Sequence, residues 1–350
     1  MPSRWLVHSG SGRSAICSSA KIRGMTLNIS RRAVAAAALA ATALWSMGAN
    51  AQAIPKTIRL VVAYPAGGVS DVIARALAEK LSAQLSTTVV VENKAGASGV
   101  IGMDAVAKAP ADGSVIGFSA ISPLVLNPHL GRSPFNAQKD IAPVASVMYS
   151  PVLILATPAT GLKDFPALMR EAKASPGAIR WATSGLASLG HIMLEQLRVA
   201  AKVDITHVPY KGGGQQMNDA LGGQFEILST NAGPTVAPHL QSGKLRALAV
   251  GAPKRLERLP QVPTLAELGY GAANLSSQFG VFAPAATPSV LIEKYNVEIN
   301  KALAAPDLRA RLLATDNVPT GGSAAEFTSE IAEEFESNER IIRAAGIKAE

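Results

Sequence analysis

The chain has 350 residues, 48% of them hydrophobic, which is enough for two domains of ordinary size with sizeable cores. Its formal net charge of +8 would suit a nucleic-acid-binding protein, but the basic excess is confined to the N-terminus. Residues 1–53 hold six basic residues and no acidic one, and removing those six from 33 leaves 27 basic residues beside 25 acidic ones. A nearly neutral remainder argues against nucleic acid as a partner.

Residues 1–53 form an N-terminal extension with the pattern of an export signal. Two arginines at 31 and 32 precede an apolar run over 33–47, which is short for a membrane span. Small residues follow at the spacing of a cleavage site, so we expect the signal to be removed near Ala51 or Ala53. An N-terminal membrane anchor is the alternative, and the shortness of the run argues against it.

The location that this signal predicts is the periplasm. Met1 and Met25 are both possible starts, and the arginine pair leaves Sec and twin-arginine export open. The single cysteine, Cys17, lies in the removable segment, so the mature chain has no disulfide and no lipidated cysteine. We therefore expect a free, monomeric protein outside the cytoplasm.

Strands and helices alternate from residue 54 onward. An apolar run over 58–63 predicts a buried strand that breaks at Pro65 and two glycines, and helical spacing resumes at Val72. We expect further strands over 88–92 and 115–120, with a helix over 103–109 between them, and an irregular connection near 127–135. This order is typical of βαβ units and a parallel sheet.

The alternation begins again near residue 150. Strands are predicted over 151–156, 179–182, 205–208, 225–229 and 245–250, and helices over 165–174, 190–201 and 215–221. A strand over 278–284 and two amphipathic helices, 289–304 and 324–345, complete the chain. Two tandem domains are one interpretation. In the other, which we favour, residues 54–150 plus 275–350 form lobe 1 and residues 151–274 form lobe 2.

Three predicted strand-to-helix turns share one chemistry. They lie at 65–71, 183–188 and 210–214, and each offers backbone N–H groups and small polar side chains at a helix start. One such turn alone is an ordinary connection of an α/β protein. If the two sheets face each other, all three turns meet in one crevice, where backbone dipoles rather than arginine would neutralise a carboxylate.

Metal and nucleotide sites lack their usual patterns. The four histidines after residue 53 are scattered without metal-ligand spacing, and no glycine-rich turn completes a dinucleotide or P-loop motif. Lys211 precedes its glycines, which is the wrong side for a phosphate-binding loop. We expect no metal and no cofactor.

A hydrolase or isomerase is the catalytic alternative. Ser184 or Ser188 with His191 and Asp71 would supply a nucleophile, a base and an orienting acid. No G-x-S-x-G elbow surrounds either serine, and a serine and a histidine at one helix start are more often a cap and a surface histidine. Asp71 likewise suits capping of its own turn better than catalysis. We expect no enzyme activity and no catalytic residues.

Four motifs in this order resemble the Bug family, the receptors of tripartite tricarboxylate transporters. They are Tyr64–Arg75 (YPAGGVSDVIAR), Val91–Gly99 (VENKAGASG), Ala111–Gly113 (ADG) and Val208–Gly213 (VPYKGG). The resemblance runs from about residue 55 to the C-terminus. It implies a periplasmic-binding-protein fold of the second type, in which two α/β lobes, each a doubly wound and mostly parallel sheet, close on a ligand.

The resemblance also implies a function. The ligand would be a small carboxylate, namely a di- or tricarboxylate, an acidic amino acid or an aromatic acid, delivered to integral-membrane permease subunits. A component that presents the ligand to a membrane sensor kinase remains an alternative.

Site residues follow by matching these motifs. The 65–71 turn would hold one ligand carboxylate, and Ser184, Gly185 and Ser188 match the second-lobe loop, although Leu186 and Ala187 stand where a second glycine is usual. The ligand-binding residues that we expect are Tyr64, Pro65, Ala66, Gly67, Gly68, Val69, Ser70, Asp71, Ser119, Ser122, Thr183, Ser184, Gly185, Ser188, Tyr210 and Asn231.

Overall fold

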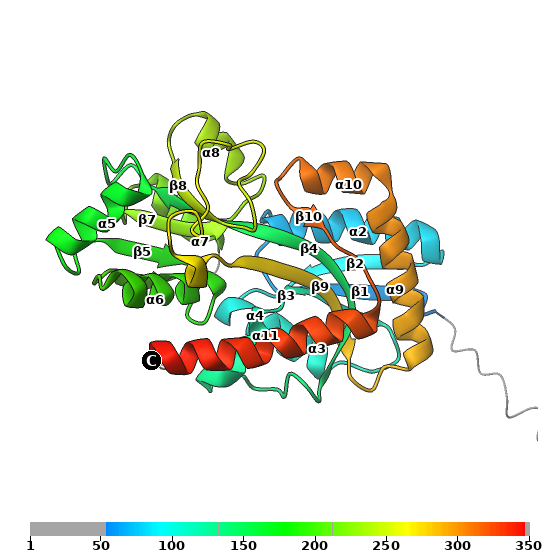
Figure 1. Cartoon of the computed structure of the whole chain (residues 1–350). Helices are drawn as coiled ribbons and strands as arrows, with labels where there is room; N and C mark the ends of the chain where they lie inside the picture. The colour runs from blue at the N-terminus through cyan, green and yellow to red at the C-terminus, as the bar shows by residue number, and fades with distance from the viewer. Residues whose placement is uncertain (1–53, 132, 212, 347–350) are drawn as a thin grey trace, which may run out of the picture. The chain divides into compact units, whose positions relative to one another are not determined.

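The computed structural model describes residues 54–131, 133–211 and 213–346 (Figure 1). The export signal and the cleavage sites expected at Ala51 and Ala53 lie outside these ranges. Within them, no helix combines the length and the apolar character that crossing a membrane requires.

Three parallel strands form the first sheet region, in the order β2-β1-β3. They are β1 (Thr57–Val62), β2 (Thr88–Asn93) and β3 (Val115–Ala120), joined by helices α2 (Val69–Leu85) and α3 (Val100–Ala107). Helix α2 buries Ile73, Leu77 and Leu81 in one apolar cluster with Leu60. This i, i+4, i+8 spacing places three side chains on one helix face, so the apolar pattern fixes how α2 lies on β1.

A second set of three parallel strands has the order β7-β5-β6. The set consists of β5 (Arg180–Thr183), β6 (Thr206–Pro209) and β7 (Ile227–Asn231), with helices α5 (Phe165–Ala174), α6 (Leu189–Ala201) and α7 (Gly213–Leu221). Trp181 and Phe165 are fully buried in its core. The two βαβ regions that the alternation predicted are therefore present.

One long strand, β4 (Ile141–Ala156), joins the two regions (Figure 1). Its first half pairs antiparallel with β9 (Ser276–Pro284), and its second half pairs antiparallel with β7 and β8 (Arg246–Gly251). The sequence predicted only 151–156 of this strand. Pro143 and two bulges interrupt the first half, which hid its strand pattern.

The sheet is mixed rather than mostly parallel. The short strand β10 (Val318–Pro319) also pairs antiparallel with β4, so antiparallel pairs surround β4 and β9 while parallel pairs lie outside them. The remaining helices are α4 (Ser122–Val125), α8 (Ala237–Gln241), α9 (Ser289–Ala304), α10 (Pro306–Leu313) and α11 (Ala324–Ala345), with 3₁₀ turns η1 (Ala97–Gly99), η2 (Asn127–Leu130) and η3 (Gly271–Ala273).

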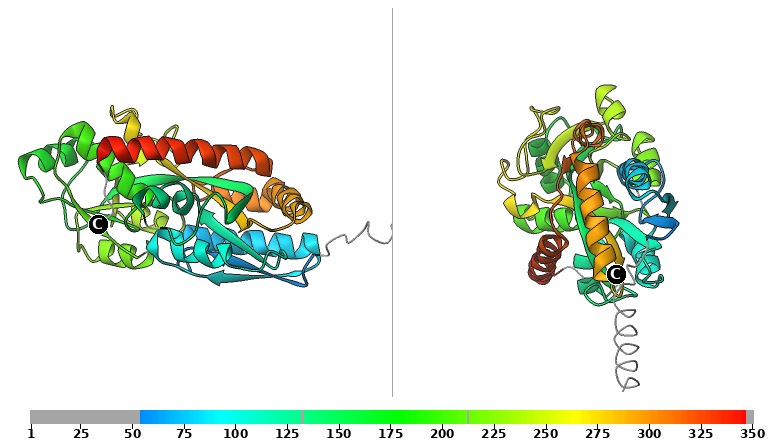
Figure 2. Two further views of the ribbon diagram at one scale, coloured as in Figure 1. Left: turned by 90° about the horizontal axis from the view of Figure 1, so that it is seen from below. Right: turned by 90° about the vertical axis from the view of Figure 1, so that its right-hand side faces the viewer.

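Helix α11 links the two regions on the face opposite α2, as the views in Figure 2 show. It packs against β4 and also against α6. A capping box begins the helix, because the Ser323 hydroxyl accepts the Glu326 N–H and the Glu326 carboxylate accepts the Ser323 N–H. Both sheet regions are thus tied by β4, β9 and α11, which leaves their strand ends free to border a shared cavity.

Candidate functional site

A cavity of about 600 Å³ lies where the strand-to-helix turns of both regions meet. Its walls come from the turn before α2, the starts of α6 and α7, and helix α8, and its floor comes from β4, β7 and β9. The predicted residues that line it are Tyr64, Pro65, Ala66, Gly67, Gly68, Val69, Ser70, Ser122, Ser184, Ser188 and Asn231. The structure therefore brings the three predicted turns to one place.

Five predicted residues do not line this cavity: Asp71, Ser119, Thr183, Gly185 and Tyr210. Ser119 is fully buried in β3. Gly185 and Tyr210 border a neighbouring cavity of about 890 Å³, which shares Pro65 and Ser98 with the first. The sequence located these five residues in the right segments but gave no orientation for their side chains.

Asp71 holds the first turn together from behind. Its carboxylate accepts the Gly67 N–H at 2.9 Å and the Asn93 side-chain amide at 3.0 Å, and it pairs with Arg75 at 2.9 Å. Burial opposes ionisation, but hydrogen bonds from these three groups outweigh it and lower the pKa of Asp71. The expected capping role is confirmed, and the carboxylate faces its own turn.

The turn that Asp71 supports presents the start of α2 to the cavity. Gly68 is the N-cap and makes no side-chain cap, and Val69 and Ser70 line the cavity. First-turn amides of an α-helix have no partner within the helix and carry partial positive charge. Tyr64 borders the same wall and packs against Phe279 in a T-shaped pair with ring centroids 6.0 Å apart, and burial raises the pKa of Tyr64 to about 12. This wall therefore offers neutral donors.

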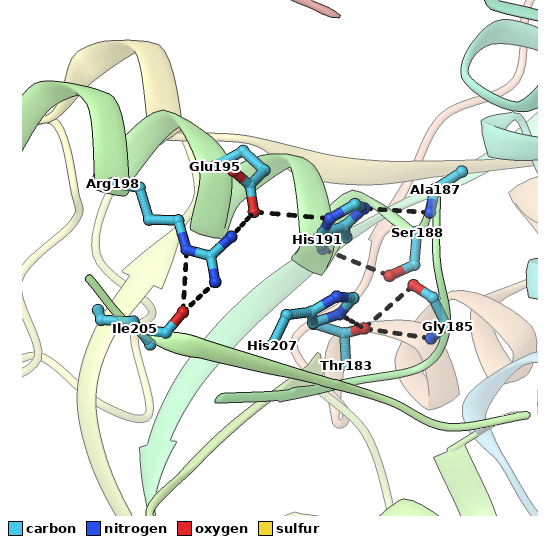
Figure 3. A network of polar contacts seen from close by, with 9 residues as sticks. All are labelled: Thr183, Gly185, Ala187, Ser188, His191, Glu195, Arg198, Ile205 and His207. Carbon is cyan, nitrogen blue, oxygen red and sulfur yellow. Dashed lines mark hydrogen bonds and ion pairs between the residues drawn. The ribbon is translucent and has the colours of Figure 1, made fainter. Parts of the chain in front are cut away.

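The second turn is folded around the Thr183 hydroxyl (Figure 3). That hydroxyl accepts the Gly185 N–H at 3.2 Å, donates to the Gly185 carbonyl at 3.0 Å and lies 2.7 Å from His207 Nε2. Gly185 has a φ of +142°, and a Cβ there would lie 2.5 Å from Ser98 Oγ. Thr183 and Gly185 thus shape the loop from within, while Ser184 and Ser188 face the cavity.

Two histidines support this loop from its buried side (Figure 3). The His191 and His207 rings stack at 4.2 Å with an angle of 6° between their planes. His191 Nδ1 accepts the N–H of Ala187, a fully buried residue with a φ of +56°. The opposite ring nitrogen of His191 lies 3.6 Å from Glu195. The conformation of this loop therefore depends on hydrogen bonds with the histidines as well as on the freedom of its glycine.

The third turn contributes Gly213 and Gly214, at the start of α7, to the cavity wall. Tyr210 instead donates its hydroxyl to Asp219 at 2.8 Å, which ties the turn to its helix. Between the first and second sheet regions, Ser98 Oγ donates to the Leu186 carbonyl at 2.7 Å. Sequence reasoning missed this contact because Ser98 and Leu186 are 88 residues apart.

Further lining residues come from surfaces that the sequence did not assign to the site. Met217 and Leu221 on α7 and His239 on α8 close one wall, and Val152 and Phe279 lie on the floor. An amphipathic pattern on α7 was the available signal for Met217, but it indicates burial without saying what the side chain faces.

The lining chemistry suits an anion held by neutral groups. Among the described residues that line the cavity there is no Lys, Arg, Asp or Glu. Three helix starts and several hydroxyls and amides supply the donors. Such backbone and hydroxyl groups bind carboxylates without a paired cation.

The catalytic alternative is not assembled. His191 uses its ring nitrogens toward Ala187 and Glu195, and Asp71 is engaged by Arg75 and Asn93. Neither group is therefore placed to activate Ser184 or Ser188. The described residues also contain no cluster of three His, Cys, Asp or Glu side chains that could hold a metal ion.

Comparison with known proteins supports the assignment that the motifs suggested. Residues 73–347 match the family model described as tripartite tricarboxylate transporter family receptor. Protein BugT of Bordetella pertussis is 35% identical over 325 residues, covering 92% of this chain and 99% of BugT. The periplasmic binding protein BugD superposes with a TM-score of 0.78 at 28% identity, covering 83% of this chain and 98% of BugD.

A solved R. palustris protein with adipate is similar as well. It is 30% identical with a TM-score of 0.79, and the match covers 84% of this chain and 99% of that one. These likenesses confirm the predicted fold class. The chain belongs to the tripartite tricarboxylate transporter receptor family, the Bug-type solute-binding proteins.

Proposed function

We propose that the chain is a periplasmic receptor that captures a small carboxylated organic acid in the 600 Å³ cavity and delivers it to an integral-membrane permease. The signal would direct export and then be removed near Ala51 or Ala53. The observation that carries the proposal is the meeting of three helix starts at a cavity whose described lining holds no Lys, Arg, Asp or Glu.

The electrostatics of the cavity favour a carboxylate. Each helix N-terminus is equivalent to about half a positive charge, so α2, α6 and α7 together could balance one or two carboxylates. The R. palustris relative with adipate shows that a protein of this fold holds a dicarboxylate. We propose the same ligand class for this chain, and no reaction on it.

Lobe closure would complete the binding step. The lobes we propose are residues 54–150 plus 275–350 and residues 151–274, and the paired strands β4 and β9 lie where the chain passes between them. The residues proposed to contact the ligand lie on both lobes, with Ser70 on one and Ser184 on the other. A ligand that touches both lobes stabilises the form in which they approach.

A thermal-shift screen of the mature protein tests the binding step. The panel contains mono-, di- and tricarboxylates, acidic amino acids and aromatic acids. Ligand at about a hundred times its Kd adds roughly 2.7 kcal/mol to the unfolding free energy, so a true ligand raises Tm clearly. No shift with any acid contradicts the proposal. Mass spectrometry of the recovered acid separates receptor from enzyme, because a receptor returns it unaltered.

A further inference from the structure

The buried side of the Thr183–Ser188 loop contains a strained peptide with a titratable partner. Ala187 is fully buried and has a φ of +56°, a conformation that non-glycine residues adopt only when the surroundings hold them there. Its N–H is donated to His191 Nδ1 at 3.2 Å. A buried N–H without an acceptor is unfavourable, so this bond helps to hold Ala187 in place.

The protons of this network can be assigned from its donors. His191 Nδ1 must be unprotonated to accept the Ala187 N–H, which places the ring proton on Nε2, facing Glu195. The Thr183 hydroxyl has a single proton, which it donates to the Gly185 carbonyl. In the bond between Thr183 and His207, His207 Nε2 must therefore be the donor. The hydrogen bonds that Thr183, Gly185 and Ala187 make in this network are then all consistent with two neutral imidazoles.

Adding a proton to either imidazole ring would destabilise this network. Protonation of His191 at Nδ1 would turn this nitrogen into a donor that faces another donor, the Ala187 N–H. The hydrogen bond that holds the strained residue would then be lost. A second charge on the stacked His207 ring, 4.2 Å away, would repel the first.

Charged groups reach the histidine pair from α6, and an uncharged one reaches it from β5. The charged side chains that act on His207 are Arg198 and Glu195 on α6, besides His191 itself. Arg198 is held by Glu195 and by the Ile205 carbonyl next to β6. From β5 the pair meets the uncharged Thr183. Burial lowers the pKa of His207 to about 3, helped by any positive charge on His191 and by Arg198 and opposed by Glu195, so the folded network disfavours the charged His207 ring.

We propose that His191 and His207 are positioning residues that hold the Thr183–Ser188 loop only while both rings are neutral, which makes the loop and any acid bound against it sensitive to low pH. The inference rests on the proposed function for its binding step. Opening exposes His207, whose ordinary pKa is about 6.5. The open loop therefore gains protons as pH falls from about 6.5 toward 3, and the closed loop is favoured above that window.

The test compares the wild-type protein with the double variant His191→Asn and His207→Gln. Asn Oδ1 replaces Nδ1 as acceptor and Gln Nε2 replaces the histidine donor, so the hydrogen bonds remain without a titrating ring. Amide hydrogen exchange of peptides covering 183–188, corrected for intrinsic rates, reports loop opening. In the wild type we expect opening to rise by up to about tenfold per pH unit below 6.5, and in the double variant to stay constant. Equal pH dependence in the two proteins overturns the proposal.

Two further measurements separate positioning from general stability. The single variant His191→Leu removes the acceptor, so its loop should exchange fast at every pH, while peptides of α2 keep wild-type rates. Adipate is the binding probe. Its own protonation affects the Kd of both proteins equally, so it drops out of the ratio of the two Kd values. From about pH 7.5 to about pH 5 its Kd should rise by about threefold or more in the wild type relative to the double variant. An equal rise in both overturns the binding step. Failure of every acid to bind contradicts the proposed function, and the exchange comparison still decides the role of the histidines.

Discussion

Single residues in this site have two roles, because most of the predicted residues line the cavity while a few shape the turns from behind. Asp71 and Thr183 were expected to contact the ligand, yet each one bonds to the backbone of its own turn. Sequence motifs place such residues in the correct turn, because turn chemistry is local. They do not say whether a side chain points outward or back, because that depends on contacts made by the folded chain, such as Asn93 with Asp71.

Replacement of Asp71 by Asn should loosen the first turn. The change removes the ion pair with Arg75, which is partly exposed, and weakens the bond to Gly67, so we expect a loss of about 1–2 kcal/mol in unfolding free energy. The pKa of Asp71 is lowered in the folded state, so its stabilising effect is present above about pH 4 and lost as pH falls further. Denaturant titrations across pH measure this difference.

A matched control is Asp307→Asn, which removes an exposed carboxylate paired with Lys80. We expect this variant to keep the stability of the wild type and its affinity for any acid found in the screen. Equal losses in both variants would contradict a specific role for Asp71.

Gly185 requires its glycine for two independent reasons. Its φ of +142° is open to glycine but strained for alanine, and a Cβ would lie 3.0 Å from the Tyr210 carbonyl. Gly185→Ala should therefore lower the unfolding free energy by about 1–3 kcal/mol and weaken ligand binding. Gly161→Ala is the control, because Gly161 is exposed, lies outside the cavity and a Cβ there meets nothing within 4 Å. Chemical denaturation and calorimetric titration of both variants decide the prediction.

At the scale of elements, the alternation of apolar runs predicted the two βαβ regions correctly. It failed where a strand or helix lacks a regular pattern. The first half of β4 contains Pro143 and two bulges, and α8 and α10 are short helices that begin near proline. The wall residues Met217 and His239 were missed for a related reason, since a helical pattern does not reveal which neighbour a helix face will meet.

Strand β5 carries the reporter for ligand binding. Trp181 is fully buried, is the only tryptophan after residue 53, and donates its indole N–H to Ser229 Oγ at 3.0 Å. Ser229 lines the cavity, so a ligand that contacts this hydroxyl changes the surroundings of the indole. We expect the emission of Trp181 to change on binding and the change to shrink in Ser229→Ala. An unaltered spectrum at saturating ligand would place the acid away from β7.

At the scale of the molecule, the cavity exists because two similar halves present their helix starts to each other. The sequence supports this arrangement through repeated turns and family motifs. The direct contact between the halves at the cavity rim, from Ser98 to the Leu186 carbonyl, cannot be read from any local pattern. Both residues belong to turns with positive-φ positions next to them, Ala97 and Ala187. The contact therefore joins two turns that both contain positive-φ residues other than glycine.

Removing that contact tests whether it contributes to closure. In Ser98→Ala the Leu186 carbonyl loses a donor worth about 1 kcal/mol, so the closed form is populated less and the Kd of a bound acid should rise about fivefold. The change should appear mainly as faster dissociation, because the contact acts after the ligand has entered. Stopped-flow and calorimetric titrations measure both quantities. Ser329→Ala, on the exposed face of α11, is the control and should behave as the wild type. If Ser98→Ala leaves the dissociation rate unchanged while binding persists, closure does not depend on this bond and must rest on contacts that the ligand itself makes with the two turns.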